Sequence, residues 1–266
     1  MIRVVLSGFN GRMGTLIAKT VAAADDMELV GGADPLAATD AVEVDGVAVA
    51  PAFTDLAHAL EETRPDVLVD FTTPSAVEGN LRCALALGID CVVGTTGLAP
   101  ERLEELAASA PAQTTLFHAP NFTLGAVLMM LFAEKAARYL PDAEVIEFHH
   151  NGKKDAPSGT AVATALRIAA ARDEAQVQSG APGKETESPG REGARGANVA
   201  GVPVHSVRSD GFFAHQEVVL GSAGETLTLR HDSFDRAAYM PGILLAIREA
   251  GRRSGLVIGL ESLLDL

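Results

Sequence analysis

The sequence is poor in aromatic residues and in cysteine, and this scarcity limits the class of protein that it can encode. It contains no Trp, and aromatic residues make up 5% of its 266 residues. The core must therefore come mainly from the aliphatic side chains that bring the apolar content to 47%. That content is ordinary for a globular chain, and the length suits one large domain or two smaller ones. The only two cysteines, Cys83 and Cys91, lie in apolar stretches, so we expect buried thiols in a reducing cytoplasm rather than disulfides.

Positive charge and long apolar runs are also scarce. The 21 Lys and Arg residues are outnumbered by 35 Asp and Glu residues, which gives a formal net charge of -14. Such an acidic surface repels phosphate backbones, so we expect no nucleic-acid partner. The start, MIRVVLSG, lacks the pattern of a signal peptide, and the apolar stretch from Leu124 meets Glu134 and Lys135 too soon to cross a bilayer. We therefore predict a cytoplasmic protein without a membrane partner.

The first half of the chain alternates between short apolar runs and helical patterns. The apolar runs predict strands over 2–6, 27–33, 66–71, 89–93 and 114–119, and the spacing of apolar residues predicts helices over 11–24, 53–63, 75–88 and 100–110. Strands that alternate with helices build a parallel sheet with helices on both faces. The sequence therefore predicts an α/β fold, a Rossmann-like doubly wound parallel sheet.

The second half has a different pattern. A long apolar helix from residue 124 precedes a strand over 143–149 and a further helix near Pro157 and Ser158. Residues 172–196 are rich in Glu, Gly, Ser and Pro, which is typical of a mobile excursion. Strands of antiparallel type follow over 199–208, 215–221 and 226–231, and a last helix over 237–251 is expected to pack back on the first domain. We thus predict a dinucleotide-binding domain of residues 1–122 plus 239–266, and an α+β domain of residues 123–238 with a mixed or antiparallel sheet for substrate binding and oligomerisation.

A glycine-rich turn follows the first predicted strand. Gly8, Gly11 and Gly14 have the spacing G-x-x-G-x-x-G at the start of a strand–turn–helix–strand unit. Glycine allows the backbone to bend tightly and to approach a pyrophosphate, while the N-terminus of the helix attracts its charge. A lone glycine motif is weak evidence, but its place in the unit favours a cofactor site over a purely structural turn. The cofactor-binding residues predicted in this turn are Gly8, Phe9, Asn10, Gly11, Arg12 and Met13.

Asp34 ends the second predicted strand, about 20 residues beyond the turn. A carboxylate there can accept hydrogen bonds from the ribose hydroxyls of NADH and would repel the 2′-phosphate of NADPH. The alternative is a turn residue before Pro35, and the nearby Arg12 would favour a phosphate. We expect NADH or NADPH as the cofactor, with NADH preferred.

Three further loops follow the carboxyl ends of predicted parallel strands, where ligands bind in such sheets. Each alone has the composition of an ordinary turn, but together they trace the rim of one cofactor site. Their predicted cofactor-binding residues are Phe71, Thr72 and Thr73 in the first loop, Gly94, Thr95 and Thr96 in the second, and Ala119, Pro120, Asn121 and Phe122 in the third.

The segment EFHHNGKKDAPSGTA, residues 147–161, concentrates basic side chains in an acidic protein. His149, His150, Lys153 and Lys154 lie within six positions and precede a helix entry at Ser158, Gly159 and Thr160. Basic side chains beside a helix N-terminus can receive a carboxylate. A solvated basic loop is the alternative, and for Lys154 it is the favoured one. Metal sites need three or four closely spaced ligands, so we predict no metal here.

With these motifs the chain resembles the 4-hydroxy-tetrahydrodipicolinate reductase family, also called the dihydrodipicolinate reductase family. The string HHNGKKDAPSGTA is similar to the family's signature, and GFNGRMG, DFTTP, GTTG and APNF match its other motifs in order. The resemblance runs nearly from end to end. The stretch 172–190 departs from it in being longer and more acidic, which leaves its role in doubt.

The resemblance implies a role for each matching residue. His149 corresponds to the general acid, and Lys153 to a residue that both contacts substrate and takes part in proton donation. His150, Gly159 and Thr160 correspond to contacts with a small dicarboxylate, and Ser158, which lies beside them, is also predicted to bind the substrate. The resemblance also implies a homotetramer joined through the sheets of the second domain, and a place in diaminopimelate and lysine biosynthesis.

The chemistry of the residues agrees with this expectation. Reduction of a cyclic imine diacid moves electron density toward the ring nitrogen, which must be met by a proton. A histidine titrates near neutral pH and can supply that proton. Three alternatives stay open: another two-domain NAD(P)-dependent dehydrogenase of an amino acid, imino acid or sugar, a regulatory protein that senses NAD(H) without turnover, and a metal-dependent hydrolase using the histidine pair.

Overall fold

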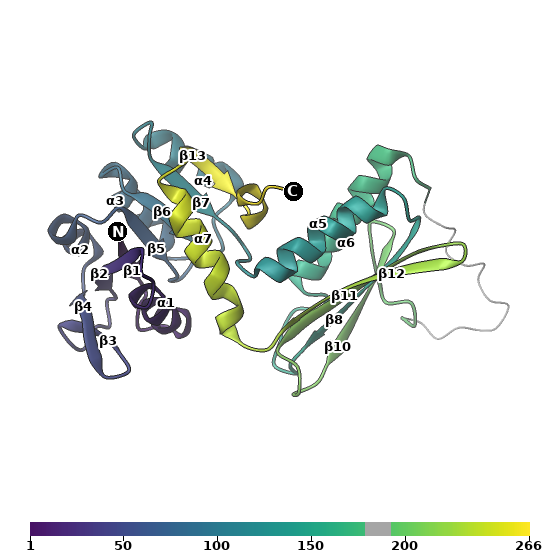
Figure 1. Ribbon diagram of the computed structural model, residues 1–266, viewed down its shortest axis with the longest axis horizontal. Helices are drawn as coiled ribbons and strands as arrows, with labels where there is room; N and C mark the ends of the chain where they lie inside the picture. Colours follow the sequence, from purple (N-terminus) through teal and green to yellow (C-terminus); the bar gives the residue numbers. More distant parts are fainter. Residues whose placement is uncertain (179–192) are drawn as a thin grey trace. The chain divides into compact units, whose positions relative to one another are not determined.

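The computed structural model describes residues 1–178 and 193–266 of the chain (Figure 1). The chain forms two compact units. Unit 1 consists of Met1–Leu124 and Tyr239–Leu266, and unit 2 of Gly125–Ala238. Each unit has its own sheet and its own helices, so each is described by itself.

Unit 1 is built on an eight-stranded sheet with the order β13-β7-β6-β5-β1-β2-β4-β3. All neighbouring strands run parallel except β3, which pairs antiparallel with β4. The strands are β1 (Ile2–Ser7), β2 (Met27–Ala33), β3 (Ala41–Val44), β4 (Val47–Phe53), β5 (Val67–Asp70), β6 (Asp90–Val93), β7 (Thr115–His118) and β13 (Gly255–Ile258). The helices are α1 (Arg12–Ala22), α2 (Leu56–Thr63), α3 (Val77–Ala86), α4 (Pro100–Ser109) and α7 (Met240–Ala250), with short 3-10 turns η1 (Arg236–Tyr239) and η2 (Leu260–Leu263).

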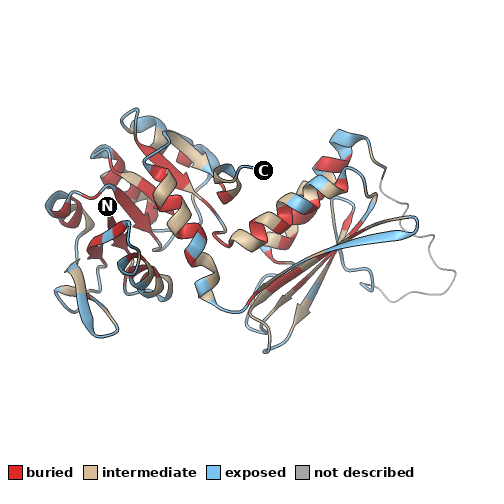
Figure 2. Ribbon diagram, in the orientation of Figure 1, coloured by how far each residue is buried: buried red, intermediate tan, exposed pale blue. Residues whose placement is uncertain are grey.

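The central strands of unit 1 are buried on both faces, as a parallel sheet between two layers of helices requires. Every residue of β5 is buried, and Figure 2 colours the inner strands almost wholly as buried. Leu60, Leu81 and Leu106 bring α2, α3 and α4 into one aliphatic cluster, while α1 contacts α7. The predicted α/β fold with a doubly wound, mostly parallel sheet is confirmed.

Two parts of unit 1 differ from the sequence prediction. The stretch 41–53 forms the hairpin β3–β4, which was not predicted, and the helix expected over 53–63 begins only at Leu56 because Phe53 ends β4. The hairpin strands are only partly buried; Glu43 interrupts β3, and β4 is an apolar run that contains Pro51, which counts against an inner strand. The edge strand β13 near the C-terminus was also missed; its four residues are apolar, but none of them is fully buried.

Unit 2 contains a five-stranded mixed sheet with the order β12-β11-β8-β10-β9. Its elements are α5 (Leu124–Ala137), β8 (Asp142–His149), α6 (Gly159–Ala175), β9 (Ala197–Val199), β10 (Val202–Arg208), β11 (Ala214–Ser222) and β12 (Glu225–Ser233). The strand expected over 199–208 is divided between β9 and β10, and β10 runs parallel to β8 rather than antiparallel. The helix α6 explains this correction, because it carries the chain from the end of β8 back to the start of a parallel strand.

One face of the second sheet packs against helices. Val145 and Val218 alternate with less buried neighbours and form an aliphatic core with Ala165 and Ile168 of α6. Figure 2 shows this alternation between buried and more exposed residues along the strands. The mobile segment was predicted to begin at residue 172, but Arg172 lies in the last turns of α6, so the predicted boundary is wrong. The rest of that prediction lies partly outside the described residues, since 179–192 are not described.

Within the described ranges, 1–178 and 193–266, no helix is both long enough and apolar enough to cross a membrane.

Candidate active site

In the glycine turn between β1 and α1 the backbone packs so closely that two positions have no room for a side chain. Gly8 has a φ of +83°, and a Cβ atom there would lie 2.6 Å from the carbonyl oxygen of Phe71. A Cβ on Gly14 would lie 2.1 Å from the carbonyl oxygen of Gly8. Gly11 is the N-cap of α1, and Arg12 is its first residue. The turn therefore needs glycine at Gly8 and Gly14, and it leaves the start of α1 open to an anion.

The other predicted residues of this turn point in different directions. Phe9 is buried and packs against Gly32, where an added Cβ would lie 2.8 Å from its ring. Asn10 and Arg12 are exposed, and Met13 is half-buried. Phe9 thus helps to hold the turn on the sheet, whereas Asn10 and Arg12 remain available to a ligand.

Asp34 lies beside the glycine turn at the end of β2. Its carboxylate accepts hydrogen bonds from the backbone N–H groups of Asn10 (3.3 Å) and Leu36 (2.9 Å). The structure therefore joins the two parts of the predicted dinucleotide site. The contact with Leu36 fits the turn residue of one sequence interpretation, and the position beside the glycine turn fits the ribose-binding carboxylate of the other.

A cavity of about 630 Å³ opens at this place. Some of the residues that line this cavity were predicted to bind the cofactor, and others were not. Its predicted lining residues are Gly8, Gly11, Asp34, Phe71, Thr72 and Thr73, and its unpredicted ones are Ser7, Ala33, Pro35, Leu36, Thr54, Asp55, Leu56, Ala57, Ala76, Gly79, Asn80 and Cys83. These lining residues include two carboxylates and no Lys or Arg. The size and the mixed apolar and polar wall suit the adenosine part of a dinucleotide.

A buried carboxylate, Asp70, organises the loops at the carboxyl ends of β5 and β6. It is 0% exposed, and its Oδ1 accepts the hydroxyl of Thr95 at 2.7 Å and that of Thr72 at 2.9 Å. Its Oδ2 accepts the side-chain amide of Asn80 at 2.7 Å. The backbone N–H of Thr72 also donates to the hydroxyl of Thr95. Asp70 thus ties two of the predicted rim loops together through uncharged donors.

Phe71 brings the third rim loop to the same place. Its ring lies 5.5 Å from that of Phe122, and a Cβ on Gly94 would lie 2.2 Å from it. Ala119 is fully buried, and the side chain of Asn121 accepts the backbone N–H of Thr123 at 2.9 Å. The three loops are therefore one structure. Pro120 and Thr96 are exposed at its surface, and residues 94–96 and 119–122 do not line the cavity.

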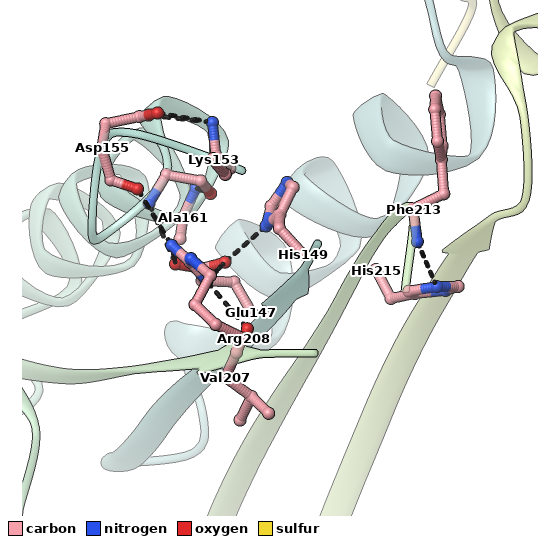
Figure 3. A network of polar contacts seen from close by, with 10 residues as sticks. Glu147, His149, Lys153, Asp155, Ala161, Val207, Arg208, Phe213 and His215 are labelled. Atoms are coloured by element: carbon pink, nitrogen blue, oxygen red, sulfur yellow. Dashed lines mark hydrogen bonds and ion pairs between the residues drawn. The ribbon is translucent and has the colours of Figure 1, made fainter. Parts of the chain in front are cut away.

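In unit 2, the predicted basic residues begin at the last residue of the central strand β8 and continue into the loop that follows; Figure 3 labels His149 and Lys153 among them. His149 is the last residue of β8 and has an exposed side-chain fraction of 15%. His150 and Lys154 are exposed. Lys153 holds both carboxylate oxygens of Asp155 with its ammonium group, at 2.7 and 2.9 Å.

A buried glutamate, Glu147, lies at the centre of this group, as Figure 3 shows. Its side chain is 0% exposed. Its Oε2 is 2.5 Å from Nδ1 of His149, and Arg208 donates to both carboxylate oxygens, at 2.7 and 2.8 Å. The backbone N–H of Ser158 donates to Oε1 at 3.2 Å. One carboxylate therefore contacts β8, β10 and the residue that caps α6.

The start of α6 is organised by Ser158. It is the N-cap, and its hydroxyl accepts the backbone N–H of Ala161 at 3.2 Å. Gly159 and Thr160 are the first two residues of the helix, so their N–H groups have no partner within the helix itself. Gly159 is exposed, and its Cβ position has open space around it. This is a helix N-terminus that can receive a carboxylate.

The environment shifts the pKa values of the two central groups. Burial, together with the positive charges of Lys153 and Arg208, lowers the pKa of His149 below its ordinary value, while the hydrogen bond and charge of Glu147 oppose this shift. Burial alone would raise the pKa of Glu147, but hydrogen bonds from Arg208, Ser206 and His149 lower it overall. Glu147 is thus held as an anion, and His149 is an acid that releases its proton readily.

Three residues of this group, Glu147, Arg208 and Asp155, were not predicted to be functional. The alternation along β8 carried a signal for Glu147, because residues two apart on a strand lie on the same face as His149. Arg208 reaches the site only because β10 pairs beside β8, with Arg208 opposite His149 in the register. In the part of the chain that the structure describes, no group of three or more His, Cys, Asp or Glu residues is placed to hold a metal ion.

Comparison with known proteins adds independent information. The family model "Dihydrodipicolinate reductase, N-terminus" matches residues 2–122, and "Dihydrodipicolinate reductase, C-terminus" matches residues 125–264. Two similar curated proteins are named 4-hydroxy-tetrahydrodipicolinate reductase. The one from Nocardia farcinica is 50% identical, with 100% of this chain and 99% of the relative covered. The one from Streptococcus gordonii is 51% identical, with 99% of both chains covered.

A solved structure agrees with the sequence comparisons. It is described as dipicolinate-bound dihydrodipicolinate reductase from Paenisporosarcina sp. TG-14. It superimposes with a TM-score of 0.87 at 40% identity, and the match covers 99% of this chain and 100% of that one. The family resemblance seen in the sequence motifs is therefore confirmed over the full length.

Proposed function

Because the chain belongs to the dihydrodipicolinate reductase family, we propose that it reduces 4-hydroxy-tetrahydrodipicolinate to tetrahydrodipicolinate with NADH or NADPH. This places it in diaminopimelate and lysine biosynthesis as an oxidoreductase. The observation that carries the proposal within the structure is the arrangement around His149. His149 is hydrogen-bonded to the buried carboxylate of Glu147, which also accepts from the residue that caps α6. A histidine placed in this way, close to a helix N-terminus and to a lysine in the following loop, suits proton donation to a small dicarboxylate.

The two units divide the work in this proposal. Residues 1–122 with 239–266 bind the dinucleotide, and residues 123–238 bind the substrate. The dinucleotide would be held by the glycine turn at Gly8 and Gly11, by Asp34, and by the loops that Asp70 ties together. The open start of α1 fits its pyrophosphate, and the cavity beside Asp34 fits its adenosine part. The reduced nicotinamide supplies hydride when it is bound.

The substrate side of the proposal assigns one task to each residue. Gly159 and Thr160 offer backbone N–H groups, and His150 and Lys153 offer side-chain donors, to the two carboxylates of the substrate. Ser158 holds the helix start in place. His149 gives its proton as electron density moves toward the ring nitrogen of the substrate, and Lys153 assists through its positive charge. The dipicolinate bound by the Paenisporosarcina protein is a diacid of the same kind.

For the cofactor we propose that NADH is preferred and NADPH is usable. The carboxylate of Asp34 lines the cavity together with Asp55, and neither Lys nor Arg belongs to its lining. A ribose with free hydroxyls can donate to Asp34, whereas a 2′-phosphate would meet two carboxylates. The exposed Arg12 at the start of α1 is the group that allows NADPH to be used.

We further propose a cytoplasmic homotetramer joined through the sheet of unit 2. Ile146, Phe148 and Val219 alternate with the core residues of this sheet and are only half-buried. A second sheet packed on this face would bury them. Both cysteines are unpaired, which suits a reducing compartment. Light scattering should give four times the 27.6 kDa mass of one chain.

The direct test is a coupled assay of reduced-nicotinamide oxidation, in which the preceding synthase makes the unstable substrate from pyruvate and aspartate semialdehyde. We expect turnover by the wild-type protein and a loss of about 10²–10⁴-fold in kcat for His149→Gln with a modest change in KM, the range of a general acid. Wild-type kcat in His149→Gln would remove this residue from its role.

The same assay separates the alternative functions. Binding of NADH without turnover in folded protein would point to a sensor of NAD(H), and turnover only on another imino acid would point to a different dehydrogenase. Loss of activity with a chelator would point to a metal enzyme.

A further inference from the structure

The charged groups around His149 form one connected network centred on Glu147. This carboxylate has no exposed side-chain surface, yet it accepts from four donors: two guanidinium N–H groups of Arg208, Nδ1 of His149 and the backbone N–H of Ser158. A buried carboxylate is costly unless it is paired and hydrogen-bonded, as it is here. The same four contacts join the acid to the start of α6.

We propose that Glu147 is a positioning residue for the reduction: it fixes the ring of His149 so that Nε2 delivers the proton, and it ties that ring to the N-terminus of α6 where the substrate carboxylate is received. This inference rests on the proposed function. It assigns a role to a residue that neither gives nor takes a proton in the reaction. Arg208 completes the arrangement by holding the carboxylate from both of its oxygens.

The choice of nitrogen follows from the geometry. Nδ1 lies 2.5 Å from Oε2 of Glu147, so the N–H at this nitrogen is engaged by the carboxylate. In the charged ring both nitrogens carry a proton, and only the one at Nε2 is free to leave. The Nε2–H bond breaks, a bond from that hydrogen to the substrate forms, and the electron pair stays on Nε2. The neutral ring then retains Nδ1–H toward Glu147 and is reprotonated at Nε2 by water.

Arg208 explains why Glu147 does not take the proton itself. Its two N–H groups bind the two oxygens of the carboxylate, at 2.8 and 2.7 Å, which stabilises the anion. The same guanidinium donates to the backbone carbonyl of Asp155. The charged groups around His149 are therefore Glu147 on its own strand, Arg208 on β10, and Lys153 with Asp155 in the following loop.

The chain offers a matched control on the same strand. Glu144 also pairs with a histidine and an arginine, since Oε2 lies 2.8 Å from Nε2 of His205 and the other oxygen accepts from Arg195. Alternation along β8 places Glu144 on the opposite face of the sheet from Glu147. Its side chain is 35% exposed, and none of its contacts involves His149. A change from Glu to Gln at 144 therefore tests the substitution without the role at His149. Because Glu144 shares the sheet face proposed for the tetramer, light scattering on this control should give the mass of the wild type.

The experiment compares Glu147→Gln with Glu144→Gln and the wild type in the coupled reductase assay. We expect Glu147→Gln to lower kcat by about 10²-fold, the lower end of the range for a general acid, with KM changed only a few-fold. Because the carboxylate raises the pKa of His149 against the effect of burial, its loss should move the alkaline limb of kcat/KM to lower pH. Glu144→Gln should keep the wild-type kcat and pH profile, and both variants should bind NADH with unchanged fluorescence titrations.

A double-mutant cycle separates positioning from a structural role. If Glu147 acts through His149, adding Glu147→Gln to His149→Gln should lower kcat by less than threefold further, because the group that it positions is already gone. A purely structural residue would lower kcat again by its full factor. Wild-type turnover with loss in His149→Gln, but an unchanged kcat and pH limb in Glu147→Gln, would overturn this inference and leave the proposed function standing.

A second variant protects the test against misfolding. Glu147→Gln leaves the guanidinium of Arg208 without its anion, whereas Glu147→Gln with Arg208→Gln removes both charges together and is better tolerated in a buried site. The double variant still lacks the carboxylate beside Nδ1. It should show the same loss in kcat with a smaller shift of the alkaline limb, because Arg208, whose charge lowers the pKa of His149, is removed as well, and a wild-type kcat in it would also overturn the proposal.

Discussion

Each unit of this protein contains a fully buried carboxylate beside its proposed site, and the two are satisfied in different ways. Asp70 in unit 1 accepts from uncharged donors: the hydroxyls of Thr72 and Thr95, the backbone N–H of Thr72 and the side-chain amide of Asn80. Glu147 in unit 2 accepts from the guanidinium of Arg208 and from His149. Hydroxyls rotate and amides turn over, so the first network can adjust to a change of its centre. A guanidinium can only donate, so the second network cannot.

This difference matches what each site has to do. The proposed dinucleotide site is formed by backbone and glycine, and its shape depends on the absence of side chains at Gly8 and Gly14. The proposed substrate site is formed by ionised side chains, and its proposed chemistry depends on the balance of charge around His149. We therefore expect unit 1 to fail when atoms are added, and unit 2 to fail when charge is removed.

The largest effect expected in unit 1 comes from an added methyl group. Gly14→Ala places a Cβ 2.1 Å from the backbone carbonyl oxygen of Gly8, which cannot give way as a flexible side chain would. The turn must shift away from α1, and a displacement of this size should weaken NADH binding by about 10²-fold. Titration of the NADH fluorescence measures this directly. Gly251→Ala, at the exposed C-terminal end of α7 where an added Cβ would lie an ordinary 3.7 Å from Asp90, is the control that should bind as the wild type does. Equal affinity in Gly14→Ala would contradict the close packing of this turn.

The next effect compares the two carboxylates. In Asp70→Asn the remaining carbonyl oxygen can still accept while Asn80 turns its amide, so the free energy of unfolding should fall by only about 1 kcal/mol. Asp70→Ala leaves several buried donors unpaired and should cost about 3 kcal/mol. Urea unfolding measures both values. In the assay, Asp70→Ala should raise KM for NADH while the alkaline limb of kcat/KM stays in place, since no part of this network touches His149. A shift of that limb would break the proposed separation between the two networks.

The contrast also explains how far the sequence could predict each region. The inner parallel strands of unit 1 are short apolar runs, and the spacing of the glycines indicates the turn, because both signals are local in the chain. The hairpin β3–β4 and the edge strand β13 are only partly buried, and although β4 and β13 are apolar, Pro51 within β4 and the lack of a following α-helix after β13 set them apart from the regular alternation, so they were missed. The basic segment from His149 to Thr160 was also visible, since it is continuous.

What the sequence could not show is which distant residues meet. Arg208 lies 61 positions from Glu147, and Asn80 lies 10 from Asp70, and only the pairing of strands and the packing of α3 bring these partners together. Predicting β10 as antiparallel also hid the register that sets Arg208 beside His149. Charge pairs of this kind depend on sheet topology, whereas strands and helices depend on local patterns.

The smallest effect that we predict concerns the choice of cofactor. Here charge, rather than shape, is expected to matter in unit 1. Asp34→Ala removes one of the two carboxylates from the cavity wall. A charge at about 4 Å in water is worth about 1 kcal/mol, so the ratio of kcat/KM for NADPH to that for NADH should rise by about fivefold. Asp40→Ala, an exposed carboxylate that does not line the cavity, should leave the ratio unchanged.

The wild-type ratio decides what this change means. If wild-type kcat/KM for NADPH exceeded that for NADH by tenfold or more, Asp34 would be a turn residue, and the exposed Arg12 would be the group that selects the cofactor. If NADH is preferred and Asp34→Ala removes the preference, one carboxylate sets the specificity of a site whose shape comes from glycine and backbone. The difference between the units would then be one of degree: charge selects the ligand in both, but only in unit 2 does it also move a proton.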